Sequence, residues 1–548
     1  MRKLVTLLIA FLLLLSSFVG CTNNSGKTPD DTTTSGEYAE TSPETTPSVT
    51  DPVSEYTYST WLSDGHVKVT GEGKAPKDAQ TSITVNMAKN EKEAFNISLR
   101  ADNNVEGIKL VMLDGETDDM KIEIFNEYLI KTGRKYHYPD PLVPYTDSFD
   151  VEKNVTKTLM VRFDADENTK AGERKYKFAL VHNDKALAEY DITVNVWNFA
   201  LPEALSCESA VGLSNDQIFM HEKTSGPLSG KIVRAYYDML VDYGMSPYDL
   251  PYDVLNDKAD EYMSDPRVTS FRVSHSYNDS TLIKQYEKLK SNPEWLDKAY
   301  YYPFDEPGDL TDLQTIEKSC ERLKSLTPEI RIVIPFFQNI TYDNNTDEVD
   351  FLDRYLGIWC PKAPCWNKNG WLADPLGRGY FGDRMAEQKE QGDKIWWYVC
   401  WEPGSPYCNL YVNEIGLEHI ELFWQQYFYE VDGFLYWASN YWNYVKPYES
   451  MATVPHLSST CYGDGSLLYP GKPVGVDGPV ASFRLDCIRN GMEDYDLLLM
   501  AEELLGRSWV VDQVKKVSES LTVHTKDAAV YFDVRNTIGD AIEAELNK

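Results

Sequence analysis

Residues 300–336 read YYYPFDEPGDLTDLQTIEKSCERLKSLTPEIRIVIPF. Both ends of this stretch are apolar and rich in aromatic or β-branched residues, as buried strands are. Between them, apolar side chains recur at the spacing of one helix face, and Asp309 precedes that run as a residue type that caps helices. The helical positions are Leu313, Ile316, Cys320 and Leu323. The stretch therefore predicts a strand, a helix and a second strand in succession.

The same alternation continues through residues 203–505, which we interpret as one domain. Candidate strands are residues 210–213, 246–250 (the weakest pattern), 268–273, 300–304, 330–336, 356–359, 395–399 and 433–437. About eight such repeats predict a (β/α)8 TIM-like barrel. A doubly wound open sheet is the alternative, but no glycine-rich phosphate loop supports it. From residue 481 the pattern is helical, so residues 506–548 are expected to form a C-terminal helical extension.

Residues 56–202 have the pattern of an all-β domain. Residues 81–99, TSITVNMAKNEKEAFNISL, alternate apolar and polar side chains on both sides of an Asn90-Glu91 turn. Further β-rich runs are residues 108–113, 121–125, 159–163, 176–181 and 190–197. Short alternating strands separated by turn-forming residues predict a β-sandwich.

The first residues have the pattern of an export signal. A basic start, an apolar run over residues 4–15 and small residues before Cys21 describe a secretory signal peptide, here residues 1–20. The Val-Gly-Cys ending resembles the lipobox of bacterial lipoproteins, with Phe18 where that motif usually has leucine. The resemblance implies lipidation at Cys21 and an exported lipoprotein, held at the bacterial cell surface or envelope by its lipid alone. The alternative is an ordinary secretory signal with a chance cysteine. Residues 21–55 are rich in Ser, Thr and Pro, which predicts a disordered tether.

Composition excludes some functions. The formal net charge of −33 argues against nucleic acid as a partner, because phosphate binding needs a basic surface. Of nine cysteines none forms a CxxC pair, and histidines are few, so no zinc or other metal site is expected. Cys320 and Cys487 fall on predicted helix faces and are expected to be buried thiols. Composition indicates no oligomeric state.

The candidate catalytic residues are Asp305 and Glu306. They follow the aromatic run that ends the fourth predicted strand, and barrel enzymes carry their active sites at the carboxyl ends of the strands. Aromatic neighbours and a second carboxyl group both raise a carboxyl pKa, as a general acid needs. The alternative is a solvated turn or a helix cap.

Aromatic residues also mark the ends of the seventh and eighth predicted strands. Aromatic rings stack on the apolar faces of sugars, and Asn side chains bind hydroxyl groups. Because strand residues alternate between two faces, only some of these side chains can reach the site. The candidate substrate-binding residues are Trp397, Tyr398, Trp437 and Asn440.

Several stretches resemble glycoside hydrolase family 123 and the wider bacterial domain family of its catalytic region. They are FDEP at residues 304–307, WWYVC at 396–400, GFLYW at 433–437 with Asn440 and Trp442, GDGSLLYPG at 463–471 and, most specifically, SFRLDCIRNGMEDYD at 482–496. The resemblance implies a retaining exo-β-N-acetylgalactosaminidase that uses substrate-assisted catalysis and a glycan as its partner. Glu306 would then be the general acid/base, and Asp305 would hold the 2-acetamido group of the substrate. The resemblance implies no metal and no organic cofactor.

Two other functions stay open. Glu402 follows the seventh predicted strand, so Glu306 and Glu402 could form the carboxylate pair of a conventional retaining β-glycosidase. The chain could also be a non-catalytic glycan-binding lipoprotein on a decayed barrel. Nothing in the sequence distinguishes N-acetylgalactosamine from N-acetylglucosamine.

Overall fold

The structure is a computed structural model. It describes residues 56–548 except 116–117, 133–135, 225–226, 344–345, 371–378, 444 and 453–460, and the side chains of 227–229. The predicted signal peptide, Cys21 and the tether lie outside the described residues. The described residues belong to one compact unit. Within the described part of the chain, every helix is too short or too polar to cross a membrane.

The N-terminal region is built from two five-stranded sheets. Their strand orders are β1-β3-β8-β5-β6 and β2-β10-β9-β4-β7. The bounds are β1 Tyr58–Asp64, β2 Ser82–Lys89, β3 Lys92–Ala101, β4 Val105–Asp114, β5 Met120–Thr132, β6 Tyr136–Pro144, β7 Phe149–Val151, β8 Thr156–Ala165, β9 Gly172–His182 and β10 Lys185–Ala200. Phe95 of one sheet packs its ring against Phe178 of the other, at 5.8 Å between centroids. The predicted turn between β2 and β3 is confirmed, and Asn90 takes the left-handed conformation (φ 57°) that asparagine tolerates.

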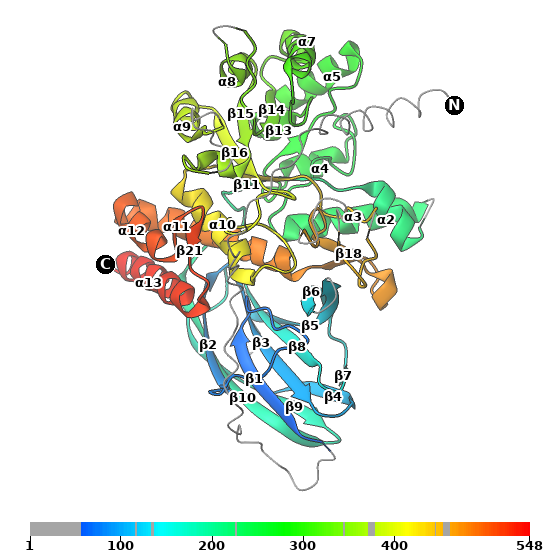
Figure 1. The fold of residues 1–548 in the computed structure, drawn as a ribbon, viewed down its shortest axis with the longest axis vertical. Coiled ribbons are helices and arrows are strands. Elements are labelled where there is room, and N and C mark those ends of the chain that lie inside the picture. Colours follow the sequence, from blue (N-terminus) through cyan, green and yellow to red (C-terminus); the bar gives the residue numbers. More distant parts are fainter. Residues whose placement is uncertain are drawn as a thin grey trace, which may run out of the picture. The chain divides into compact units, whose positions relative to one another are not determined.

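The second region contains a nearly closed barrel of seven parallel strands in the order β11-β17-β16-β15-β14-β13-β12 (Figure 1). The bounds are β11 Glu208–Val211, β12 Phe271–Arg272, β13 Ala299–Tyr301, β14 Arg331–Phe336, β15 Ile358–Pro361, β16 Lys394–Tyr398 and β17 Gly433–Tyr436. Seven of the eight predicted strands are therefore confirmed, and the open doubly wound alternative does not describe this sheet.

The weak eighth pattern, residues 246–250, forms no strand but lies in the gap between β11 and β12. The Tyr248 amide donates to the Val211 carbonyl at 2.8 Å, and the Arg272 amide donates to the Tyr248 carbonyl at 2.6 Å. Pro247 makes a single bridge to Val211. Because proline has no N–H to donate, this segment cannot extend a regular ladder. The two sheet edges are thus linked by hydrogen bonds at one short segment.

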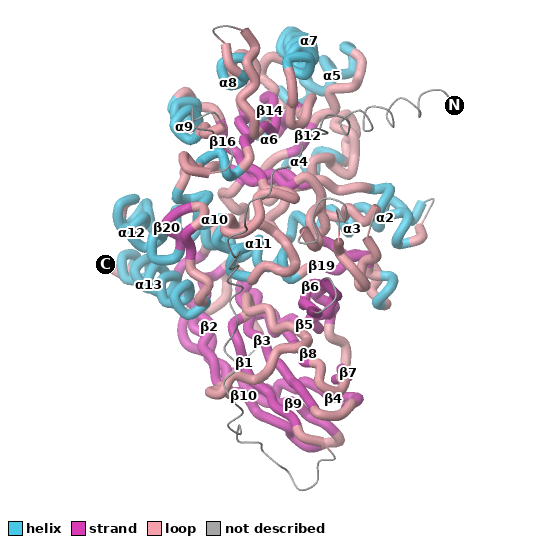
Figure 2. Tube along the Cα trace, viewed as in Figure 1, coloured by secondary structure: helices cyan, strands magenta, loops and turns pink. Residues whose placement is uncertain are grey.

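Helices surround the barrel and follow its strands (Figure 2). Their bounds are α2 Asn215–Glu222, α3 Pro227–Asp242, α4 Ala259–Ser264, α5 Asp279–Lys290, α6 Pro293–Lys298, α7 Leu310–Leu326, α8 Glu348–Leu352, α9 Gly382–Glu390 and α10 Gly416–Phe428. Helix α7 confirms the helix predicted between the two strands of residues 300–336. The Asp309 carboxylate accepts from the amides of Thr311 and Asp312, and the four predicted core positions of α7 are buried.

The chain ends in a hairpin and three helices. Their bounds are β18 Leu468–Pro470, β19 Pro479–Ala481, α11 Phe483–Leu505, α12 Arg507–Val517 and α13 Ala528–Leu546, with a small hairpin of β20 Ser518–Ser520 and β21 Val523–His524 before α13. The helical prediction for this end is thus right except for the small hairpin. Cys487 of α11 and Cys320 of α7 are buried free thiols, as predicted.

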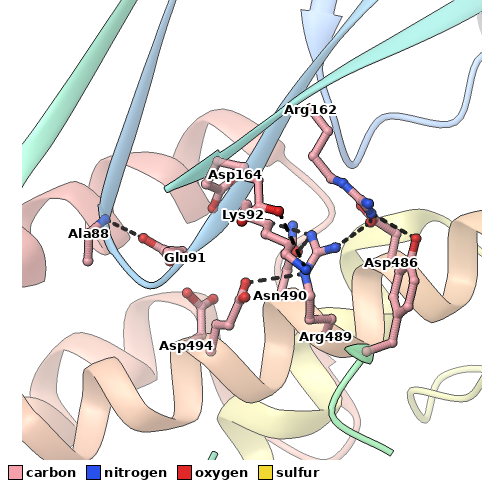
Figure 3. Close-up of polar contacts among 12 residues, drawn as sticks. Ala88, Glu91, Lys92, Arg162, Asp164, Asp486, Arg489, Asn490 and Asp494 are labelled. Carbon is pink, nitrogen blue, oxygen red and sulfur yellow. Dashed lines mark hydrogen bonds and ion pairs between the residues drawn. The ribbon is translucent and has the colours of Figure 1, made fainter. Parts of the chain in front are cut away.

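The most specific sequence motif, residues 482–496, lies on α11 and binds the N-terminal sheets (Figure 3). Asp486 accepts from Arg489 of the same helix at 2.7 Å and from Arg162 of β8 at 2.6 Å. Burial alone would raise the pKa of Asp486, but the two guanidinium groups outweigh it and lower that pKa. Arg489 also donates to the Lys92 carbonyl at 3.2 Å. The motif therefore joins the barrel region to the β-rich region.

Candidate active site

Asp305 and Glu306 lie directly beyond β13, at the carboxyl edge of the barrel. The Glu306 amide donates to the carbonyl of Pro335 in β14 at 3.1 Å. Glu306 has a φ of 44°, a left-handed conformation that is uncommon for a residue with a side chain. The hydrogen bond to β14 holds this turn in place. The positive φ puts backbone strain at Glu306, where the carboxyl group is presented.

Glu306 is held by a hydroxyl group and an ammonium group from the next two strands. Tyr398, the last residue of β16, donates its hydroxyl to Glu306 Oε1. The Lys362 ammonium, just beyond β15, lies 3.5 Å from the same oxygen. The Lys362 side chain is 1% exposed, whereas the Glu306 side chain is 31% exposed. A buried cation and a hydroxyl donor therefore both contact one oxygen of the Glu306 carboxylate.

Asp305 has a different environment. Tyr302 donates its hydroxyl to Asp305 Oδ1 at 2.7 Å, and the Tyr302 ring packs edge-on against Tyr248 at 5.8 Å between centroids. The side chain opens to solvent, but the surrounding protein partly removes its carboxyl from water. This desolvation raises the pKa of Asp305, and the Glu306 charge raises it further, against the lowering effects of Tyr302 and Lys362. Two adjacent carboxyls in unlike environments can take two different roles.

Trp437 follows β17 and is partly exposed at the same barrel edge. Its indole nitrogen donates to Asp464 Oδ2 at 3.1 Å, and the Tyr436 hydroxyl donates to Asp464 Oδ1 at 3.0 Å. Asp464 is fully buried, and burial raises its pKa to about 6. Trp437 and Tyr302 both pack against the apolar cluster inside the barrel, which contains Tyr398. Asp464 thus fixes the orientation of the indole.

Trp397 and Asn440 are not brought to Asp305 and Glu306. Trp397 is fully buried outside the barrel, where its indole donates to Gln426 of α10 at 3.1 Å. Its neighbours on β16, Trp396 and Tyr398, belong to the cluster inside the barrel. Asn440 is also buried, and its amide accepts from the Ser214 amide at 2.8 Å and donates to the Ser214 carbonyl at 2.9 Å. Both ends of that side chain are occupied in joining two loops.

Sequence reasoning did not find Lys362, Asp464 or Trp401. Lys362 lies 4.0 Å from the Phe337 ring centroid and 5.9 Å from the Trp401 ring centroid, so it is enclosed by aromatic rings. Trp401 is 38% exposed, which is unusual for so large an apolar side chain and fits a surface for sugar stacking. The signal that could have identified Lys362 is a lysine shortly after an apolar predicted strand, residues 356–359. Glu402 is partly exposed in the loop beside Trp401.

A group of side chains with metal-binding chemistry lies on other elements. Among the described residues, Cys408, Glu421 and His524 place one potential ligand atom each within 4.8 Å of one another. His524 Nδ1 lies 2.7 Å from Glu421 Oε2, so an ion pair already accounts for these two groups. The group connects α10 and the loop before it to the β20–β21 hairpin.

Residues 236–501 match the glycoside hydrolase 123 catalytic domain. The predicted resemblance is thereby confirmed, and the match to family 123 supports a glycosidase that hydrolyses glycans. A similar solved structure is a family 123 glycoside hydrolase from Clostridium perfringens, described in a study of glycolipid glycan hydrolysis. It is 14% identical, with 90% of this chain and 98% of that chain covered and a TM-score of 0.64, which shows a shared fold.

Similarity to other glycoside hydrolases is weaker. A family 39 enzyme from Bacteroides cellulosilyticus is 10% identical over 74% of this chain and 81% of that chain, with a TM-score of 0.30. A search of curated proteins found no match. Support for a glycosidase comes from the family 123 match.

Proposed function

We propose that the chain removes β-linked N-acetylgalactosamine from the non-reducing ends of glycans, with retention and by substrate-assisted catalysis. The observation that carries this proposal is the Asp305-Glu306 pair. The two carboxyls are adjacent, and they differ in their partners: Tyr302 for Asp305, and Tyr398 with Lys362 for Glu306. Adjacent residues suit a mechanism in which the substrate supplies its own nucleophile, because the second carboxyl only has to hold it.

In the first step, protonated Glu306 donates its proton to the glycosidic oxygen as the bond to the anomeric carbon breaks. The 2-acetamido oxygen of the substrate attacks that carbon, and a cyclic oxazolinium ion forms. Asp305 accepts a hydrogen bond from the acetamide N–H and stabilises the developing positive charge. Tyr302 keeps the Asp305 carboxyl in position.

In the second step, Glu306 acts as a base. Lys362 and Tyr398 stabilise the carboxylate that the first step leaves behind. This carboxylate takes a proton from water, and the resulting hydroxide attacks the anomeric carbon from the face that the leaving group occupied. Two inversions give overall retention. Trp437 supports the sugar ring from the end of β17. This scheme needs no metal and no organic cofactor.

The experiment is hydrolysis of four aryl β-glycosides by the purified full chain: the N-acetylgalactosaminide, the N-acetylglucosaminide, the galactoside and the glucoside. We expect turnover of the 2-acetamido sugars alone, with the N-acetylgalactosaminide faster. Turnover of the galactoside or glucoside would contradict the substrate-assisted scheme and favour Glu306 with Glu402. Binding of all four without turnover would favour the glycan-binding alternative.

We further propose that the enzyme is an exported bacterial lipoprotein anchored through Cys21. The basic start, the apolar run and the Val-Gly-Cys ending support this proposal. A polar tether between Cys21 and the first strand would let the catalytic region reach glycans outside the cell.

A further inference from the structure

Three side chains from distant segments of the chain meet at a buried point beside α10. Cys408 lies in the loop between β16 and α10, Glu421 lies on α10, and His524 lies on β21. One ligand atom of each lies within 4.8 Å of the other two. In a tetrahedral zinc site with these ligand types, neighbouring ligand atoms are about 3.3–3.5 Å apart. Modest rotations of the three side chains would therefore place all three atoms on one ion.

The His524 ring is held in the tautomer that a metal needs. Its Nε2 lies 3.0 Å from the carbonyl oxygen of Pro406, in the loop that carries Cys408. Because a carbonyl only accepts, Nε2 carries the hydrogen, and Nδ1 of the neutral ring has a free lone pair. Metal-binding histidines commonly donate their other ring N–H to a backbone carbonyl in this way. The metal-binding nitrogen, Nδ1, is the one that faces Glu421, at 2.7 Å from Oε2.

Glu421 is a buried carboxylate that lacks a permanent counter-ion among the described residues. Its side chain is 0% exposed, and its Oε1 has no hydrogen-bond partner in the described part of the chain. The ion pair with His524 involves only Oε2 and requires a second proton on the ring. Glu418, one turn earlier on α10, is paired with Lys526 at 3.2 Å. A buried carboxylate oxygen without a partner costs free energy that a divalent cation would recover.

Cys408 adds a soft ligand to this pair. It is 2% exposed, and the Gln425 amide nitrogen donates to Cys408 Sγ at 3.4 Å. Gln425 lies on α10 one turn after Glu421, so the same helix supplies a ligand and a hydrogen bond that orients a second ligand. A thiolate, an imidazole and a carboxylate together favour zinc over calcium or magnesium, which prefer oxygen ligands. Three protein ligands leave the fourth position of the tetrahedron for water.

We propose that Cys408, Glu421 and His524 bind a structural zinc ion that fastens the β20–β21 hairpin to α10 and to the loop before it. Binding displaces the thiol proton of Cys408 into solvent, together with the second ring proton of His524 where that is present. The zinc ion then takes over the place of that proton between His524 and Glu421.

The position of the ion gives it a structural role. The hairpin leads into α13, where Asp540 accepts from the Trp197 indole of β10 at 2.8 Å. An ion that holds the hairpin on α10 therefore fixes the start of the helix that contacts the β-rich region. Cysteine spacing in the sequence argues against zinc, but spacing detects only ligands that are close in sequence, and these three come from separate segments.

The test measures zinc by elemental mass spectrometry in the purified full chain, after one equivalent of zinc is added and unbound metal is removed. We expect about one zinc ion per chain in wild type and less than about a tenth of that in Cys408→Ser and in His524→Ala. His137→Ala is the matched control, because His137 Nδ1 also lies 2.7 Å from a carboxylate, that of Glu72, but both side chains are exposed. Cys320→Ser removes a buried free thiol on another helix and should also keep the zinc.

Two further measurements separate loss of metal from loss of structure. Chelation should lower the Tm of wild type by about 5 °C, and Cys408→Ser should show the lower Tm with or without the chelator. Cobalt(II) in place of zinc should give wild type a sulfur-to-cobalt charge-transfer band in the near ultraviolet that Cys408→Ser lacks, and this comparison decides the site even if His524→Ala does not fold.

The site is overturned if wild type takes up no zinc and shows no cobalt band, since the ion pair of His524 and Glu421 would then be complete without a metal. Zinc kept at the wild-type level by both Cys408→Ser and His524→Ala would also overturn it. None of these measurements uses a glycan, so their outcome is independent of the proposed function.

Discussion

The two carboxyls of the proposed catalytic pair are adjacent in sequence but have different electrostatic surroundings. Glu306 contacts a buried ammonium and a hydroxyl donor, whereas desolvation dominates at Asp305 and raises its pKa. The aromatic run before Asp305 and Glu306 predicts a protonated general acid. In the structure the rings of Tyr302 and Tyr248 lie on the Asp305 side. The proposed acid, Glu306, instead has partners that stabilise its charge after it has given up its proton.

Replacement of Glu306 tests the acid role. Glu306→Gln keeps the shape of the side chain but cannot donate the required proton, so kcat on an oligosaccharide should fall about 10²–10⁴-fold. An aryl glycoside with a very acidic phenol as leaving group needs little protonation and should lose far less in the first step. Steady-state kinetics on both substrates measure the difference. Equal loss on the two would remove Glu306 from the acid role.

Replacement of Asp305 tests how the nucleophile is held. Asp305→Asn removes the charge that stabilises the oxazolinium ion and should lower kcat on all 2-acetamido substrates by about 10²–10³-fold. Asp309→Asn is the control, because Asn still caps α7 and lies four residues further along the chain. Wild-type turnover in Asp305→Asn would exclude the substrate-assisted scheme, whatever the sugar specificity.

The pH profile tests the contact between Tyr302 and Asp305. In the proposed mechanism activity requires ionised Asp305, so it should be lost as pH falls through the pKa of this carboxyl, which desolvation raises. The Tyr302 hydroxyl lowers that pKa, and Tyr302→Phe should therefore raise it and move the acid limb of the kcat profile to higher pH. Tyr248→Phe keeps a ring against Tyr302 without touching Asp305 and should move the limb less. A shift to lower pH would contradict the assignment.

At the scale of elements, periodicity predicted most strands and helices but not which face of a strand meets the substrate. Residues 395–399 are apolar throughout, so nothing in that run distinguishes Tyr398, which faces inward, from Trp397, which faces α10. Residues 246–250 were the weakest strand pattern, and Pro247 limits them to a single bridge. Lys362 follows β15, whereas Glu306, which it contacts, follows β13. Contacts between residues of different strands depend on the order of the strands in the sheet, and the local sequence pattern does not reveal that order.

The contacts of helix α11 explain why its sequence motif, residues 482–496, is specific to this domain but not to a substrate. Its charged residues are buried: Arg489 is 2% exposed and pairs with Asp486 at 2.7 Å and Glu493 at 3.5 Å. Removing one partner of a buried pair leaves an uncompensated charge, so Arg489→Met should lower the free energy of unfolding by about 3–5 kcal/mol. Urea unfolding measures this change.

An exposed arginine provides the control for that prediction. Arg267 is 41% exposed and also pairs with two carboxylates, so Arg267→Met should change the free energy of unfolding by less than about 1 kcal/mol. The KM of folded Arg489→Met should match wild type, because the Arg489 side chain contacts Lys92 of the β-rich region and carboxylates of its own helix rather than the site. A raised KM with unchanged stability would give the motif a role in substrate binding.

At the scale of the whole molecule, the β-rich region and the barrel share buried charges. Arg535 of α13 donates to Asp494 of α11 at 2.8 Å and lies 3.1 Å from Glu93 of β3. Three segments far apart in the sequence thus meet through one guanidinium group.

The anchor itself is the last prediction. If Cys21 is acylated, a bacterium that expresses the full chain and is fed an alkyne-labelled fatty acid should place the label on the protein, and the activity should sediment with membranes. Cys21→Ser should lose the label, because serine has no thiol to which the lipid can be attached. Cys487→Ser is the matched control: it removes a buried thiol and should keep the label. A secreted wild-type protein without label would instead establish an ordinary signal peptide ahead of a chance cysteine.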